Sequence, residues 1–476
     1  MSQLSAMQRS NTFARRVPLH WLQPQHRCSS VQVATQVDEP VSAEWANARP
    51  YSEIPGPRPL PLIGNAWRFL PVIGTFPGSD SLLWQKQMQK YGPISKLTSI
   101  PGKRDLVFLF DPRDFETTYR HEGQWPERAM FEALPYYRQV ERKEFYQNVG
   151  GVLVENGEGW QKFRSYVNPV MMQPRNAPIA MVALDTRLGC LQSNLPADSE
   201  PYRLINAAGE IFEVFIHLNL KFPLWKYVST PTWRRFVRAL DTFKDVSMRH
   251  IENAQRRLTE KPQQDEAEMS VLEKLLLRDP NPKKATVMAI DMMMAGIDTT
   301  SYTAGGVLYH LARNPEQQER LFYELKEAMP SPDSTLTADI LEDLKYLKAC
   351  IKENNRLNPI AIGISRLTQE NIVLANYQVP KGTDVLMGNM LLTTSEDYFP
   401  KASSFLPERW LKNSGSCPAH GEQKPNPFTM LPFGFGKRNC VVRKYRLEWH
   451  HPEMRFKSSA FLSPQDPLRI RFSARN

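Results

Sequence analysis

The most informative segment of the chain is Leu431-Pro-Phe-Gly-Phe-Gly-Lys-Arg-Asn-Cys440. It places two glycines, two aromatic residues and two cations directly before a single cysteine. Glycine permits a tight turn and a close approach to a flat group, and arginine pairs with anions. The glycine spacing matches neither a P-loop nor a dinucleotide-binding fingerprint. The segment therefore predicts a turn that brings Cys440 and Arg438 to a flat, anionic partner.

The composition of the whole chain is that of an ordinary globular protein, with 476 residues, 41% hydrophobic and 23% charged. Its five cysteines are widely scattered and include no Cys-x-x-Cys pair, so they support neither a disulfide framework nor a clustered zinc site. Residues 1–37 contain four arginines and no acidic residue, so they account for +4 of the net charge of +10. The remaining +6 is too mild to predict nucleic-acid binding.

The N-terminal region predicts a targeting segment followed by a linker. Residues 1–37 are rich in arginine and serine with interspersed apolar residues, which is typical of a mitochondrial transit peptide; a solvated basic tail is the alternative. They lack the roughly 18 unbroken apolar residues of a membrane anchor. Residues 38–61 predict a polar linker and a Pro-rich hinge, because the prolines of 54–61 forbid a helix. Residues 62–476 then form one large domain.

The remaining sequence predicts a fold that is mainly α with small β-sheets. The segments Ala285–Arg313 and Leu341–Leu357 have helical periodicity, and an Asn-Pro pair that ends a helix follows each of them. Short strands are expected at Ile372–Tyr377, Thr383–Met387 and Leu468–Phe472, each bounded by turn residues.

The cysteine segment resembles the haem-binding loop Phe-x-x-Gly-x-Arg-x-Cys of the cytochrome P-450 monooxygenases, through Phe433, Gly436, Arg438 and Cys440. The resemblance implies a single large helical haem-thiolate monooxygenase fold. It also implies haem b as cofactor, with the Cys440 thiolate as axial ligand of the iron, where it favours O–O cleavage.

A second motif supports the resemblance. Glu353 and Arg356 lie three apart on the predicted helix, which alone indicates an ordinary exposed pair. However, they resemble the family's Glu-x-x-Arg helix, and Phe405-Leu-Pro-Glu-Arg409-Trp resembles the segment that adds a further arginine. The resemblance implies a buried network of Glu353, Arg356 and Arg409 beneath the haem.

The segment Ala295-Gly-Ile-Asp-Thr-Thr300 resembles the family's oxygen-binding helix. That resemblance implies a widened helical turn for dioxygen, with Asp298 and Thr299 as the catalytic residues that deliver protons. The residues alone leave another interpretation open, in which Gly296 allows close helix packing and Thr299 bonds to the carbonyl four residues earlier.

Three further residues resemble the family's propionate-binding groups. Trp160 and Arg164 lie four apart, so they share one helical face and reach the same carboxylate. Arg366, in Gly363-Ile-Ser-Arg366, resembles the residue that meets the other propionate.

The transit peptide, together with Lys348 and Lys352 one helical turn apart, resembles the mitochondrial, insect-type class of the family. The class implies insertion of one oxygen atom from O2 into an apolar small molecule, a steroid or a xenobiotic. Electrons come from a ferredoxin that an NADPH-dependent ferredoxin reductase reduces. The two lysines then bind the acidic ferredoxin, or are simply a solvated face. The class also implies peripheral association with the matrix side of the inner membrane, and no nucleic acid.

The chain departs from the family pattern at two places. Val442 replaces a glycine, and residues 440–446 lack the helix that should follow the cysteine. Residues 173–189 likewise replace two expected helices, so parts of the central four-helix bundle are predicted to be missing. This leaves an alternative function: a non-catalytic or misfolded product of a truncated or misspliced gene of the same family.

Overall fold

The computed structural model describes residues 43–70, 72–76, 80–171, 188, 195–260, 269–279, 281–331, 334, 337–411, 426–440, 456–458 and 462–464. Residues 1–47 and 48–476 are two compact units, and the fold that follows is that of the second. The predicted transit peptide, residues 1–37, lies outside the described residues.

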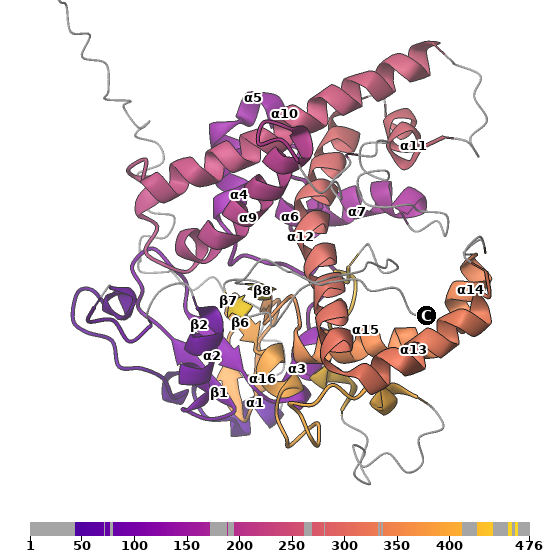
Figure 1. Cartoon of the computed structure of the whole chain (residues 1–476). Coiled ribbons are helices and arrows are strands. Elements are labelled where there is room, and N and C mark those ends of the chain that lie inside the picture. Colours follow the sequence, from indigo (N-terminus) through magenta and orange to yellow (C-terminus); the bar gives the residue numbers. More distant parts are fainter. Residues whose placement is uncertain are drawn as a thin grey trace, which may run out of the picture. The chain divides into compact units, whose positions relative to one another are not determined.

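Helices make up most of the described chain (Figure 1). The α-helices are α1 (Ala43–Asn47), α2 (Ser81–Gln89), α3 (Pro112–Arg120), α4 (Ala133–Tyr136), α5 (Lys143–Tyr146), α6 (Gly151–Val154), α7 (Gly157–Met171), α9 (Glu200–Asn219), α10 (Pro231–Glu260), α11 (Val271–Arg278), α12 (Lys283–Arg313), α13 (Pro315–Ala328), α14 (Ala338–Asp343), α15 (Lys345–Leu357) and α16 (Asn389–Thr393). Short 3₁₀ helices are η2 (Tyr51–Glu53), η3 (Ala66–Phe69), η5 (Leu224–Lys226), η6 (Pro407–Trp410) and η7 (Pro427–Thr429), and η4 (Tyr137–Glu141) is a π-helical turn.

The strands form three small sheets. They are β1 (Ile94–Leu97), β2 (Leu106–Leu109), β3 (Ile364–Leu367), β4 (Ile372–Leu374), β5 (Tyr377–Val379), β6 (Asp384–Met387), β7 (Phe456–Ser458) and β8 (Leu462–Pro464). The main sheet has the order β1-β2-β6-β3, with β2 and β6 parallel and the other pairs antiparallel. The pairs β4-β5 and β7-β8 are antiparallel hairpins. The observed mixture confirms the predicted class, mainly α with small sheets.

Helix α12 contacts α9, α10 and α11 as well as α13 and α15 (Figure 1). Its first half is buried all round, at every position from Ala285 to Met294, and packs among α9, α10 and α11. Its second half packs on α15 at Gly306, where an added Cβ would lie 2.2 Å from Asn354 Oδ1. The helix ends at Arg313 before Asn314-Pro315, as the sequence predicts.

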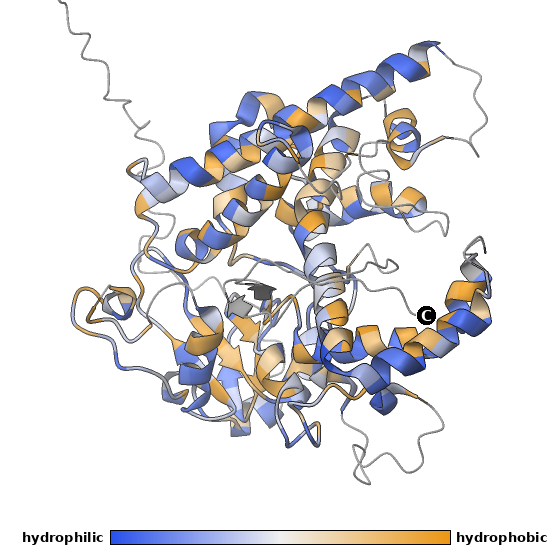
Figure 2. Ribbon diagram, in the orientation of Figure 1, coloured by the Kyte–Doolittle hydropathy of each residue, from blue (hydrophilic) through white to orange (hydrophobic). Residues whose placement is uncertain are grey.

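Apolar patterning explains the two core regions that support the site. Helix α10 buries one stripe of apolar residues, and Figure 2 shows apolar and polar positions alternating along it. In the main sheet, Val107 and Leu109 of β2 join one apolar cluster, while Leu106 and Phe108 join another on the opposite face.

The prediction of one helix over Leu341–Leu357 is wrong, because α14 and α15 are separate helices. Leu344 between them has ψ 77°, outside the helical range. The carboxylate of Glu324 accepts hydrogen bonds from the backbone N–H groups of Tyr346 (2.7 Å) and Leu347 (2.9 Å), which stabilises the new helix start. A tertiary contact from α13 therefore sets the break.

The prediction of a single strand over Ile372–Tyr377 is also wrong. Ala375 and Asn376 have φ values of 47° and 64° and turn the chain between β4 and β5. Asp114 of α3 accepts a hydrogen bond from the Ala375 backbone N–H at 2.8 Å, which holds the turn. The strand expected at 383–387 is confirmed as β6, whereas the one at 468–472 lies outside the described residues.

The bundle helices predicted to be missing fall largely where the structure gives no description. Residues 172–187, 189–194 and 441–455 lie outside the described residues, so that prediction stays a prediction. Within the described ranges, no helix combines the length and the apolar character needed to cross a bilayer.

Candidate functional site

The cysteine loop folds as the glycines predict. Gly434 and Gly436 have φ values of 70° and 72°, a left-handed conformation that favours glycine. The backbone N–H of Cys440 donates to the carbonyl of Phe433 at 2.9 Å, which closes the loop. A Cβ at Gly436 would lie 2.1 Å from Glu122 Oε1, so a side chain there would displace the Glu122 carboxylate. The loop ends at Cys440, which is exposed.

Arg438 lies inside this loop with 5% of its surface exposed. Its Nε donates to Pro126 O at 2.6 Å, and its Nη2 donates to Glu155 O at 2.7 Å and Asn156 Oδ1 at 2.9 Å. Its guanidinium carbon also lies 4.4 Å from the centre of the Trp160 ring. The Nη1 atom is buried and has no hydrogen-bond partner among the described residues.

Three further arginines approach the same loop. Arg164 of α7 donates from Nη2 to Asn439 O at 3.2 Å, and its buried Nε has no partner among the described residues. Arg128 donates to Arg438 O at 3.1 Å. Arg366 of β3, which is 1% exposed, donates from Nε to Glu122 Oε2 at 2.6 Å. The structure thus gathers Trp160, Arg164, Arg366 and Arg438, the predicted propionate-binding and loop residues, beside Cys440.

This arginine cluster, defined as Arg128, Arg164, Arg366 and Arg438, has an excess of positive charge. Burial and then the charges of Arg128 and Arg366 lower the pKa of Arg438 to about 9. Burial and then the charge of Arg366 lower the pKa of Arg128 to about 10. Like charges in a buried site require an anion nearby. The two unpartnered guanidinium atoms and this charge suit the propionate carboxylates of a haem, so the residues present fit that cofactor.

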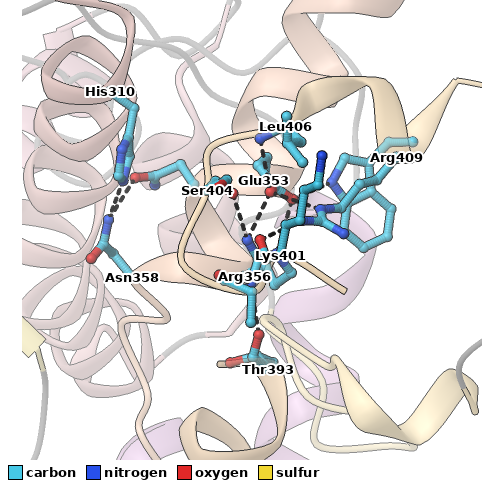
Figure 3. Close-up of polar contacts among 12 residues, drawn as sticks. His310, Glu353, Arg356, Asn358, Thr393, Lys401, Ser404, Leu406 and Arg409 are labelled. Carbon is cyan, nitrogen blue, oxygen red and sulfur yellow. Dashed lines mark hydrogen bonds and ion pairs between the residues drawn. The ribbon is translucent and has the colours of Figure 1, made fainter. Parts of the chain in front are cut away.

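The glutamate network joins α15 to η6 (Figure 3), and its charged members Glu353, Arg356 and Arg409 are all buried. Glu353 accepts from Arg356 Nε at 3.0 Å and Nη2 at 2.8 Å, and from Arg409 Nε at 3.1 Å. Two donors that the sequence motifs did not identify complete the shell, the Trp410 indole and the Leu406 backbone N–H, each at 3.0 Å.

Arg356 carries this network into the chain that precedes η6. It donates to the carbonyl oxygens of Thr393 (2.9 Å), Ala402 (2.7 Å) and Ser404 (3.0 Å). Figure 3 shows Thr393 and Ser404 beside Arg356. The ion pair on α15 therefore fixes the end of α16 and the irregular segment before η6 through main-chain oxygens, which no side-chain motif encodes.

Asp298 and Thr299 lie on α12 in a regular helical turn. Thr299 Oγ1 donates to Ala295 O at 2.7 Å, the local bond that the residues alone allow, and the widened turn is not seen because α12 is α-helical throughout. Asp298 is 5% exposed, and its Oδ2 has no partner among the described residues. Burial raises the pKa of Asp298 to about 7, a rise that the nearby Tyr302 hydroxyl only partly offsets.

Lys348 and Lys352 are exposed on α15, the helix whose other face buries Glu353. Lys348 Nζ donates to Glu342 O at 2.7 Å, and Lys352 Nζ lies 5.9 Å from the centre of a Trp410 ring. The same helix therefore joins a cationic surface to the buried network.

Sequence reasoning missed the roles of Arg128 and Glu122. Neither residue lies in any of the motifs described above. Only their contacts with Arg438 and Arg366, across more than 240 positions of sequence, reveal them.

This chain is similar to one family model and to several known proteins. The family model described as cytochrome P450 matches residues 177–443. The probable mitochondrial cytochrome P450 301a1 of Drosophila melanogaster is 36% identical, over 91% of this chain and 88% of the relative. The probable mitochondrial cytochrome P450 12a5 of the same species is 35% identical, over 90% and 92%. Cytochrome P450 CYP12A2 of Musca domestica is 34% identical, over 94% and 95%.

Proposed function

Since this chain belongs to the cytochrome P450 family and is therefore a haem-thiolate monooxygenase, we propose that it is a mitochondrial, ferredoxin-dependent enzyme. Its reaction inserts one oxygen atom from O2 into an apolar small molecule, a steroid or a foreign compound. The observation that carries the proposal is the buried arginine cluster beside the exposed thiol of Cys440. The bound haem supplies the oxidising chemistry, and the protein supplies its ligand, its orientation and its protons.

The cofactor would be held by residues from four segments. Cys440 would supply the thiolate that binds the iron, and the turn at Phe433 and Gly436 fixes the position of its backbone. The arginine cluster and Trp160 bind the propionates, because the unpartnered Nη1 of Arg438 and Nε of Arg164 are free to donate. These donors orient the cofactor and neutralise the charge that burial makes unfavourable.

Asp298 is the residue best suited to move a proton. A carboxyl group with a pKa of about 7 holds and releases a proton at neutral pH, and its Oδ2 is not occupied by another described group. Thr299 adds a hydroxyl next to it; for that hydroxyl to take part, it must exchange its bond to Ala295 O.

The electron donor we propose is an acidic ferredoxin, reduced by an NADPH-dependent ferredoxin reductase. Lys348 and Lys352 offer it a cationic surface, one turn apart on α15. The relatives named mitochondrial support the compartment, and the predicted transit peptide of residues 1–37 supplies the route.

We also propose peripheral binding to the matrix side of the inner membrane. An apolar patch supports it, formed by Leu60, Leu62, Ile63, Leu70, Val72, Ile73, Phe222, Leu224, Tyr227 and Val228, all exposed. Its two segments adjoin, because Leu220 packs in one cluster with Phe69. Apolar side chains so exposed suit the interfacial region of a bilayer. The double variant Leu62→Asp/Val72→Asp should lose co-sedimentation with cardiolipin vesicles while keeping its haem; unchanged sedimentation would count against this surface.

The experiment that tests the function uses the purified full chain supplied with haem. We expect one haem per chain, a thiolate spectrum of the reduced carbon monoxide complex, and NADPH oxidation that depends on ferredoxin and its reductase. Cys440→Ser should abolish the thiolate spectrum. Failure to bind haem would instead support the non-catalytic product of an altered gene, an alternative that the match over 91% of this chain does not favour.

A further inference from the structure

A small cavity lies within the apolar cluster on one face of the main sheet. It leaves about 50 Å³ of space, where a single water needs about 10–15 Å³. Its walls come from η3, α2, β2 and the chain that leaves α9, represented by Phe69, Trp84, Phe108 and Leu220. None of its lining residues belongs to the arginine cluster, the cysteine loop or the glutamate network, although Ala129 and Met130 directly follow Arg128 of that cluster.

The side chains of β6 alternate between the two faces of the sheet, and one carboxylate lies on the face that holds the cavity. Leu386 belongs to the cluster that lines the cavity, while Val385 and Met387 belong to the cluster on the opposite face. Asp384, two residues before Leu386, therefore shares its face and is among the lining residues. It is 5% exposed, and its Oδ1 accepts no hydrogen bond from the described residues.

A second lining residue, Trp84, has a buried hydrogen-bond donor without an acceptor in the described part of the chain. Trp84 is 4% exposed, and its Nε1 donates to no acceptor among the described residues. Its ring is fixed by an edge-to-face contact with Phe69, with centroids 5.0 Å apart. By contrast, Asn219 is bonded to Glu132 N and Phe215 O, so its amide is already satisfied. Two described lining residues thus carry a buried polar atom without a partner, the acceptor Asp384 Oδ1 and the donor Trp84 Nε1, and leaving such groups unpaired is unfavourable.

The charges around the cavity discriminate between possible ligands. Lys103 pairs with Glu132 at 3.2 Å, and both line the cavity with Arg104. The two cations Lys103 and Arg104 balance the two carboxylates Asp384 and Glu132, so a buried ion finds no net opposite charge here to offset its loss of hydration. A hydroxyl group carries no charge, and it donates one hydrogen bond while accepting others.

We propose that this cavity binds the hydroxyl end of a neutral, apolar alcohol, which donates to Asp384 and accepts from Trp84. The space accommodates the hydroxyl and the first few carbons, and the apolar walls cover them. The site goes beyond the proposed monooxygenase function and does not depend on haem or on turnover.

The test uses octan-1-ol as probe with the haem-loaded full chain, and saturation-transfer NMR to measure its dissociation constant. Methyl octyl ether, octan-1-amine and octanoate are the comparators, since they remove the donor or add a charge. We expect octan-1-ol to bind at least tenfold more tightly than each of them. The haem absorption spectrum, recorded in the same samples, reports any ligand that enters the haem pocket instead.

Two variants locate the binding. Asp384→Ala should weaken octan-1-ol binding at least tenfold, whereas Asp114→Ala should leave it unchanged, because Asp114 is a carboxyl group on α3 with a similarly raised pKa of about 6 and does not line the cavity. Leu220→Trp, which fills space, should also weaken binding and decides the matter if Asp384→Ala does not fold. Equal binding of alcohol and ether, unchanged binding in Leu220→Trp, or no saturable binding would each overturn the proposal, the last leaving water as the occupant.

Discussion

Replacing Glu353 with glutamine should strongly destabilise the protein. The carboxylate accepts five hydrogen bonds, three at Oε1 and two at Oε2. It also balances two arginines, Arg356 and Arg409, that are 0% and 4% exposed. Glutamine keeps one acceptor oxygen but points an NH2 group at donors, and it leaves both guanidinium charges without a counterion.

The magnitude follows from that geometry. Breaking a buried ion pair by removing one partner costs about 3–5 kcal/mol, against a total stability of about 5–15 kcal/mol for a typical protein. We therefore expect Glu353→Gln to lose at least 3 kcal/mol, roughly a 150-fold shift in the folding equilibrium, and to release haem under conditions where the parent retains it.

The assay is urea unfolding at 25 °C, followed by tryptophan fluorescence, with haem content measured in parallel. Glu116→Gln is the matched control, because Glu116 pairs with an exposed Arg120 at 2.5 Å and such pairs contribute below about 1 kcal/mol. If Glu353→Gln unfolds within 1 kcal/mol of Glu116→Gln, the reasoning on the buried network is refuted.

Three further predictions concern the cofactor, the proton and the donor. Arg438→Gln should weaken haem retention at least tenfold in transfer to apomyoglobin, whereas Arg438→Lys should lose less; equal loss would contradict a charge-based role. Because burial raises the pKa of Asp298 to about 7, its contribution to stability is complete below about pH 4 and is lost as the pH rises through 7. Asp298→Asn should flatten that pH dependence of stability in urea titrations. It should also remove the change near pH 7 from the pH dependence of the turnover rate; an unaltered pH–rate profile argues against proton transfer by Asp298. Lys348→Glu/Lys352→Glu should raise the KM for ferredoxin at least tenfold with an unchanged haem spectrum, while Lys345→Glu should not raise it. An equal change in KM for the double variant and for Lys345→Glu would exclude a specific docking surface.

The sequence predicts elements whose signals are local and misses those set by contacts. The end of α12 before Asn314-Pro315 is local, because proline cannot continue a helix. The break at Leu344 has no such signal, since apolar periodicity runs through it and Glu324 of another helix stabilises it. The turn at Ala375-Asn376 is similar, because its left-handed Ala375 is held by Asp114.

The site shows the same division. The spacing of Glu353, Arg356 and Arg409 was readable because the motifs are short, and their contacts follow from one helix and one 3₁₀ turn. The part played by Arg128 was not readable, since its partner is the main chain of Arg438. Every residue has a main-chain carbonyl, so the sequence does not indicate which carbonyl accepts a hydrogen bond, and only the fold shows such contacts.

The contacts that close the cysteine loop also determine when the site forms during synthesis. Arg438 Nε reaches Pro126 O across 312 positions, and Lys437 Nζ reaches Gln124 O across 313. Chains leave the ribosome N-terminus first, and closing long loops carries an entropic cost that later contacts must offset. Residues 122–156 are therefore synthesised long before Lys437 and Arg438, the partners that they contact in the folded protein. Cofactor capture is consequently a late event, which begins only after Cys440 has emerged.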